Sequence, residues 1–242
     1  MVTPEAMSGE GGLPAPDEQL RRDVVLANRL AHHAGLVTAF GHLSARIPGA
    51  AAFVIPTRAS PALASEQRLL VMDLEGNRLA GAGTPNTEFW IHARIYAARP
   101  DVGAVAHVHS PACVVLGQLG YTVRPLHNSA FFAQVPVFER VGLIRTRELG
   151  DAVALELGGQ RAMLLRGHGA NVVAADVRRV AVLACFLEEA ADYQLRAMAA
   201  GGGDISRIRF FDAPEADRAE AELEGTGPIT RAWEYYLSLM DQ

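Results

Sequence analysis

The sequence predicts a layered α/β fold whose central sheet is not purely parallel. Segments with strand character are interspersed with helical segments along most of the 242 residues, which is typical of α/β layers. In the first half of the chain, neighbouring strand segments are joined by only a few turn residues, and such short connections pair strands antiparallel. Half of the residues are apolar, which is enough for the core of one large domain.

The first half of the chain is expected to form one helix followed by two hairpins. Apolar residues recur at helical spacing in the first segment, and Gly35 supplies a stop. Short β-rich runs then flank glycine-containing turns. The expected elements are a helix over 17–35, strands over 41–47 and 52–55 around the turn at 48–49, and strands over 69–73 and 78–80 around the turn at 75–77.

The second half is expected to alternate helices with strands. Asn86 or Thr87 is positioned to cap a helix that ends before Pro100, which places Glu88 in the first helical turn. A loop surrounds His127. The other expected elements are strands over 104–109, 162–165 and 171–174, helices over 110–120, 146–157 and 176–198, and two short helical patterns near the end, the last over 230–240.

Three regions are expected along the chain. Residues 1–16 are rich in glycine, proline and acidic residues and lack the basic start and apolar centre of a secretory signal, so they predict a disordered tail. Residues 17–200 contain the elements of the main domain. Residues 201–242 begin with three consecutive glycines and predict a linker and a C-terminal helical extension of the same domain.

Charge and hydropathy exclude several classes of partner. The net charge is −5 and no long run of lysine or arginine is present, so a nucleic-acid partner is not expected. No apolar stretch reaches the roughly 18 uninterrupted residues that a membrane span needs, so no membrane partner is expected either. The only cysteines, Cys113 and Cys185, lie in apolar helical patterns, which predicts reduced, buried thiols and a cytoplasmic location.

Two histidines at the end of a predicted strand are the main candidates for a metal site. His107 and His109 are two residues apart, so in an extended strand both side chains project from the same face. His168 lies between two glycines, which allow a sharp turn, and Glu88 lies at an element end. A lone His-x-His pair also occurs where histidines are only structural, but these further groups favour a metal centre. His92 shares the Glu88 helix face, and packing or support of the site explains it better than ligation.

Several stretches follow one another along residues 17–200: Gly41-His42-Leu43-Ser44, Ile55-Pro56-Thr57, Asn86 to Tyr96, Arg99-Pro100-Asp101-Val102, His107-Val108-His109 and Gly167-His168-Gly169. Together they resemble the class II aldolase/adducin family. The resemblance implies a three-layer α/β/α fold around a central, largely antiparallel sheet, and a homotetramer with active sites between subunits. It also implies that His107, His109 and His168 hold a metal ion and that Glu88 is the acid/base.

The substrate-facing motifs differ from those of the sugar-phosphate aldolases in that family. Those enzymes have Gly-Asn-x-Ser where this chain has His42 after Gly41, and they have Thr-Gly where this chain has Thr57-Arg58. Arg58 obstructs a backbone phosphate nest, which needs small residues, and its planar guanidinium suits a carboxylate. The chain is more similar to the branch that decarboxylates hydroxylated aromatic acids. The expected substrate contacts are His42, Ser44, Thr57, Arg58, Asn86, Thr87 and His127.

The expected function is therefore that of a metal-dependent carbon–carbon lyase, which decarboxylates a hydroxylated aromatic or heteroaromatic carboxylate or dicarboxylate. One divalent ion is the expected cofactor, manganese or zinc first, with iron(II) and cobalt open because three imidazoles without a thiolate do not select one ion. Glu88 is the expected proton donor. Three alternatives remain: an aldolase acting on a small hydroxy-carbonyl compound, an iron(II)-dependent oxygenase, and a non-catalytic adducin-like interaction module.

Overall fold

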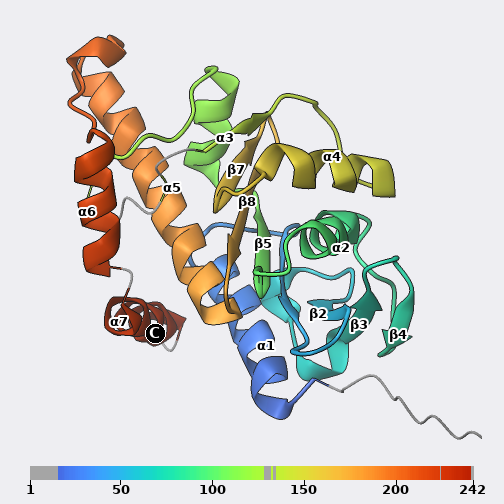
Figure 1. Ribbon diagram of the computed structural model, residues 1–242. Helices are drawn as coiled ribbons and strands as arrows, with labels where there is room; N and C mark the ends of the chain where they lie inside the picture. Colours follow the sequence, from blue (N-terminus) through green and yellow to red (C-terminus); the bar gives the residue numbers. More distant parts are fainter. Residues whose placement is uncertain (1–15, 128–131, 133–134, 224, 241–242) are drawn as a thin grey trace, which may run out of the picture.

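The computed structural model of the protein describes residues 16–127, 132, 135–223 and 225–240 (Figure 1). The predicted N-terminal tail, apart from Pro16, lies outside these residues. Within the described ranges, none of the helices combines the length and the apolar character that crossing a membrane demands.

The described residues form an eight-stranded sheet with the strand order β4-β3-β2-β1-β5-β8-β7-β6. Neighbouring strands are antiparallel except β6 and β7, which are parallel. The prediction of a largely antiparallel sheet is confirmed. The strands are β1 (His42–Arg46), β2 (Ala52–Pro56), β3 (Leu69–Asp73), β4 (Arg78–Ala80), β5 (Ala104–Val108), β6 (Val137–Phe138), β7 (Ala162–Leu165) and β8 (Gly169–Ala174).

Helices cover both faces of the sheet, which gives three layers (Figure 1). One apolar core lies between the sheet and α1 (Glu18–His33), α3 (Pro111–Gln118), α5 (Val177–Ala200) and α7 (Thr226–Met240). A second core lies between the opposite face and α2 (Phe89–Ala98) and α4 (Arg147–Leu157). The helix α6 (Ala213–Leu223) precedes α7, whose Ile229 and Trp233 are buried in the first core. Cys113 and Cys185 are buried free thiols, as predicted.

The structure corrects the start of α2. Glu88 occupies the N-cap position, outside the helix, and neither Asn86 nor Thr87 is the cap. The Glu88 side chain does not cap the helix, because its Oε1 accepts a hydrogen bond of 2.8 Å from the backbone N–H of Ile144 in a distant loop. The carboxylate is therefore fixed by a long-range contact, which leaves it at the end of the helix and beside the sheet.

Other boundaries differ by smaller amounts. The strand β6 was not predicted, because its two residues are too few to show an alternating pattern. The strand β8 begins at Gly169, two residues before the predicted start, because it pairs with β7 and β5 from its first residues. The last helix begins at Thr226 instead of 230.

The side chain of Asn28 joins α1 to β1. Asn28 is fully buried, its Nδ2 donates to the carbonyl of Leu43, and its Oδ1 accepts from the N–H of Leu43, at 3.0 and 2.9 Å. A second bond from Nδ2 reaches the Val24 carbonyl at 2.8 Å. Because buried backbone groups need partners, Asn28 holds in place the strand that carries His42.

We expect Asn28→Ala to lower the free energy of unfolding by about 2 kcal/mol or more, since it leaves the buried N–H and carbonyl of Leu43 without partners. Urea unfolding followed by circular dichroism measures this loss. Asn77→Ala is the matched control, because Asn77 is exposed and, within the part of the chain that the structure describes, bonds only to Asp73 in a turn. Its change should stay below about 0.5 kcal/mol. Equal losses in the two variants would contradict the role assigned to Asn28.

Candidate metal centre and active site

Three neighbouring strands place a row of polar side chains on one face of the sheet. His42 of β1 lies directly opposite His107 of β5, and His107 lies directly opposite Asn171 of β8. The residues that follow or precede them, such as Leu43 and Ala106, point into the core on the other face. The polar row is nearly inaccessible: His107 and Asn171 have no exposed surface and His42 is 4% exposed. The row faces α2.

The glycines on either side of His168 bring it to this row. Gly167 has a φ of +67°, a conformation that other residues rarely adopt. At Gly169 a Cβ atom would lie 2.0 Å from the carbonyl oxygen of Val108, so only glycine lets β8 approach β5 this closely. His168 therefore lies against the histidines at the end of β5, and the sequence Gly-His-Gly is explained by two separate backbone requirements.

Glu88, His107, His109 and His168 converge on one point. One ligand atom from each of the four lies within 4.8 Å of all the others. The Nε2 atoms of His107 and His109 are 3.2 Å apart, and Glu88 Oε2 lies 3.8 Å from His107 Nε2 and 3.6 Å from His168 Nε2. Two atoms that each lie about 2.0–2.2 Å from a tetrahedral ion are separated by roughly 3.3–3.6 Å. The spacing therefore resembles that of ligands around a single ion.

Unpartnered nitrogen atoms show that the cluster suits a cation. Both ring nitrogens of His168 are buried and have no hydrogen-bond partner among the described residues. His107 donates from Nδ1 to Asn171 Oδ1 at 2.9 Å, because an amide oxygen can only accept, so its Nε2 keeps a lone pair directed at the cluster. A divalent ion held by His107, His109 and His168, beside the carboxylate of Glu88, would suit these groups.

The protonation states agree with this arrangement. Burial lowers the pKa of His107, and His168 and His109 lower it further, although Glu88 acts in the opposite direction. Burial also lowers the pKa of His109. Burial alone would raise the pKa of Glu88, but the adjacent His168 and His107 and the Ile144 N–H hold it well below its usual range. The neutral forms of His107 and His109 and the ionised form of Glu88 are therefore favoured.

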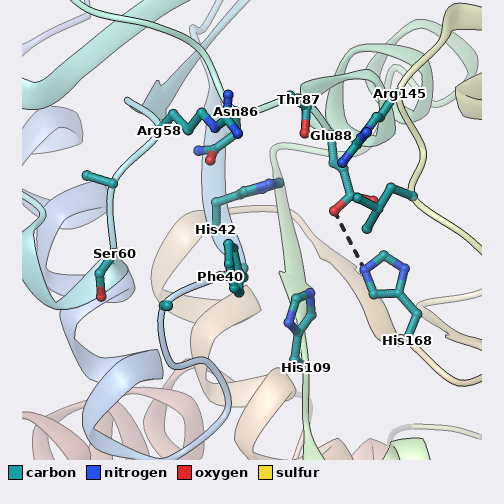
Figure 2. Close-up of a pocket in the computed structure, with 14 residues that line it drawn as sticks. Phe40, His42, Arg58, Ser60, Asn86, Thr87, Glu88, His109, Arg145 and His168 are labelled. Atoms are coloured by element: carbon teal, nitrogen blue, oxygen red, sulfur yellow. Dashed lines mark ion pairs between the residues drawn. The ribbon is translucent and has the colours of Figure 1, made fainter.

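A cavity of about 470 Å³ opens over this centre. Figure 2 shows His42, Glu88, His109 and His168 directed toward it, with Arg58 and Asn86 on one side and Arg145 on the other. The volume is in the range of small-molecule sites. The predicted site residues that line the cavity are His42, Arg58, Asn86, Thr87, Glu88, His109 and His168. His107 lies beneath them, in contact with His109.

Three predicted substrate contacts do not line this cavity. Ser44 is fully buried and hydrogen-bonds with His92 and Tyr96 beneath the site. Thr57 is 9% exposed and its backbone is engaged with neighbouring segments. The ring of His127 packs against Tyr193 of α5, with the ring centroids 4.9 Å apart.

The comparisons with known proteins agree with the geometry. Residues 22–195 match the family described as the Class II Aldolase and Adducin N-terminal domain. The chain belongs to this family. The family predicted from the short motifs is thereby confirmed.

Two relatives and one solved structure extend over nearly the whole chain. The chain is 29% identical to a 3,4-dihydroxyphthalate decarboxylase of Arthrobacter keyseri, over 95% of this chain and 97% of the relative. It is 30% identical to a putative aldolase class 2 protein of Caulobacter vibrioides, over 98% of this chain and 94% of the relative. An aldolase II superfamily protein from Pseudomonas syringae has the same fold, with a TM-score of 0.80, 24% identity and 94% and 95% coverage. The family and these relatives support an enzyme, a decarboxylating lyase with aldolase chemistry as the alternative.

Further residues of this class II aldolase-like site were not predicted from the sequence. Phe40, Leu143 and Arg145 line the cavity, and Arg145 comes from a loop without a periodic pattern, in a stretch with several other arginines. Asn171, which orients His107, lies within an apolar strand. A polar residue inside a fully buried strand is the one signal that indicates such a role.

We expect Asn171→Ala to weaken binding of zinc about 10- to 100-fold, because His107 loses the acceptor that fixes its orientation and its Nδ1 proton. Competition with a fluorescent zinc chelator measures the affinity. His33→Ala, at an exposed histidine near the end of α1, serves as the control and should leave the affinity unchanged. An unchanged affinity in Asn171→Ala would show that this amide does not support the metal centre.

Proposed function

We propose that this protein is a metal-dependent decarboxylase of hydroxylated aromatic or heteroaromatic dicarboxylates. The observation that carries the proposal is the convergence of one ionised carboxylate and three imidazoles at the base of a cavity whose rim holds two arginines. The similarity over almost the full chain to a protein named 3,4-dihydroxyphthalate decarboxylase supports the same substrate class.

The cavity rim suits a substrate with two carboxylates. Arg58 and Arg145 are exposed, lie on opposite sides of the cavity (Figure 2), and make no ion pair within the described ranges of the chain. Each guanidinium offers a planar pair of donors that matches a carboxylate. Asn86 lies beside Arg58 and Thr87 lies beside Glu88 (Figure 2), and His42 contributes a ring nitrogen from below. The rim residues thus fix the orientation of a flat dianion above the imidazoles.

A divalent ion bound at the imidazoles would supply a Lewis acid that stabilises negative charge on a substrate oxygen. We propose manganese or zinc, since imidazoles and a carboxylate suit both ions, with iron(II) and cobalt as further candidates. His107, His109 and His168 are the proposed ligands. His107 keeps its lone pair directed at the ion because Asn171 accepts its other proton.

Glu88 is the proposed acid/base. Its lowered pKa means that Glu88 is a carboxylate before the substrate binds, and a carboxylate has no proton to donate. The substrate resolves this difficulty: Glu88 first accepts the proton of the ortho hydroxyl, and then returns it to the ring carbon that bears the leaving carboxylate. The carbon–carbon bond then breaks, carbon dioxide leaves, and the phenolate that remains takes a proton from water. Atoms and charge balance without any redox partner.

A homotetramer and a cytoplasmic location remain predictions. The first rests on the family resemblance and the second on the cysteine content.

An aldolase acting on a small hydroxy-carbonyl compound is the second candidate, because the family includes such enzymes and the same metal centre would stabilise an enolate. Aldehyde release without carbon dioxide would identify it. Oxygen consumption would instead identify an iron(II) oxygenase.

We expect the zinc- or manganese-loaded protein to release carbon dioxide from an ortho-hydroxy aromatic dicarboxylate, and a chelator to abolish this release. Glu88→Gln should lower kcat by about 10²- to 10⁴-fold, because an amide cannot carry the proton from oxygen to carbon. The measurement is carbon dioxide release in single-turnover assays, with metal content determined in parallel. Full activity in Glu88→Gln, or activity that survives complete removal of metal, would disprove the proposed mechanism.

We expect Arg145→Ala to raise KM for a dicarboxylate about tenfold, because the variant loses a charge-assisted pair of hydrogen bonds. KM for the analogue that lacks the second carboxylate should change less than about twofold, since it makes no such contact. Arg140→Ala is the control, because Arg140 is exposed in the same segment but does not line the cavity. Equal effects on both substrates would exclude Arg145 as a carboxylate contact.

A further inference from the structure

A chain of buried polar side chains runs from the cavity into the core beneath it. His42 Nδ1 lies 2.7 Å from His92 Nε2, His92 Nδ1 lies 2.6 Å from Ser44 Oγ, and Ser44 Oγ lies 2.8 Å from the hydroxyl oxygen of Tyr96. His42 is 4% exposed, Tyr96 is 1% exposed, and the other two have no exposed surface. The mechanism above uses only the first member of this chain.

The chain arises from two regular elements that face each other. His42 and Ser44 are two residues apart on β1, so they project from the same face of the sheet. His92 and Tyr96 are four residues apart on α2, so they share one face of the helix. A polar network of this kind is costly in a core unless every member is satisfied. Because the network begins at His42, which lines the cavity, it can act on the site.

The imidazoles of His42 and His92 each carry one proton on a ring nitrogen. The two rings are buried, which disfavours an imidazolium ion, and the nitrogen that accepts each hydrogen bond of the chain carries no proton. Both imidazoles are consequently neutral. A neutral imidazole has one nitrogen that donates and one that accepts, so the direction of the hydrogen bonds at one end of the chain determines the direction at the other.

Tyr96 determines that direction. Among the described residues, Ser44 Oγ is the one side-chain partner within hydrogen-bond distance of the Tyr96 hydroxyl, at 2.8 Å, so it is the acceptor for the buried hydroxyl proton. Tyr96 therefore donates to Ser44, Ser44 donates to Nδ1 of His92, and Nε2 of His92 donates to Nδ1 of His42. The reverse order would leave the buried Tyr96 proton without an acceptor, which is unfavourable.

We propose that Tyr96, Ser44 and His92 are positioning residues that hold His42 in one tautomer, with its proton on Nε2 and that N–H available to a substrate oxygen in the cavity. His42 lines the cavity (Figure 2). The identity of the oxygen, a carboxylate or a phenolate oxygen, rests on the proposed function. The fixed tautomer itself rests only on the hydrogen-bond geometry.

The same argument separates His42 from the metal ligands. The rings of His42 and His107 are neighbours across two strands, with centroids 5.3 Å apart. Asn171 Oδ1 accepts the Nδ1 proton of His107, which leaves a lone pair on Nε2. His92 instead donates to Nδ1 of His42, which leaves a proton on Nε2. An acceptor behind one ring and a donor behind the other thus give adjacent histidines opposite roles, one as a metal ligand and one as a hydrogen-bond donor.

Neutron diffraction from crystals of the full-length, perdeuterated protein loaded with zinc tests this proposal directly. We expect deuterium on Nε2 and none on Nδ1 of His42, and deuterium on Nδ1 of His107. Deuterium on Nδ1 of His42 would overturn the proposal. This measurement needs neither a variant nor a substrate, so its outcome is independent of whether the protein proves to be a decarboxylase.

Ser44→Ala removes the hydroxyl that donates to His92, so neither direction of the chain is favoured any longer. We expect deuterium divided between the two nitrogens of His42, and a fall in kcat/KM on the order of tenfold, the equivalent of one hydrogen bond to an anionic substrate. Ser110→Ala is the matched control, because Ser110 is equally buried and its hydroxyl has no described partner. It should keep one tautomer and a kcat/KM within about twofold of the native value. A single, unchanged tautomer in Ser44→Ala would overturn the proposal.

Discussion

The antiparallel pairing of β5 with β1 on one side and β8 on the other places His42, His107 and Asn171 in one row across the sheet. The side chains of a strand alternate between the two faces, so a slip of one residue would move the polar groups of that strand to the opposite core. The strand register is therefore a condition for the whole site. Contacts such as Asn28 against β1 and Gly169 against β5 maintain this register. The site depends on them although they do not line the cavity.

The row of buried polar side chains also lowers the stability of the fold unless its nitrogen and oxygen atoms have hydrogen-bond or metal partners. Burial of an imidazole without a hydrogen-bond partner costs free energy. The two ends of the row differ in which groups can interact with the ring nitrogens. On the His42 side, protein groups complete the network through His92, Ser44 and Tyr96. On the His168 side, both ring nitrogens lack a hydrogen-bond partner among the described residues, and a metal ion would engage the one directed at the cluster. A bound ion would then stabilise the fold as well as support the reaction.

Much of the sheet, and the histidine pair of the candidate metal centre, could be predicted from the sequence, because both depend on local patterns. Short turns between strands indicate antiparallel pairing, and His107 with His109 shares a face for the same reason that any i, i+2 pair does. The role of Ser44 could not be predicted in this way. It shares a face with His42, but whether a position on that face lies in a cavity or in the core depends on where α2 packs, which is a long-range property. The contact between Glu88 and Ile144 is likewise invisible to local patterns.

The position of the charges divides the site into two parts with different physical demands. Glu88 and His107 are buried and His109 and His168 are half-buried, so any change there alters hydration and protonation together. Arg58 and Arg145 are exposed at the rim, where a guanidinium keeps most of its hydration and its replacement costs the fold little. Rim residues are thus free to differ between proteins that share the same buried centre. Under the proposed function, the residues of the Glu88 and histidine cluster determine how the carbon–carbon bond is broken, and the rim residues determine which molecule is held over them.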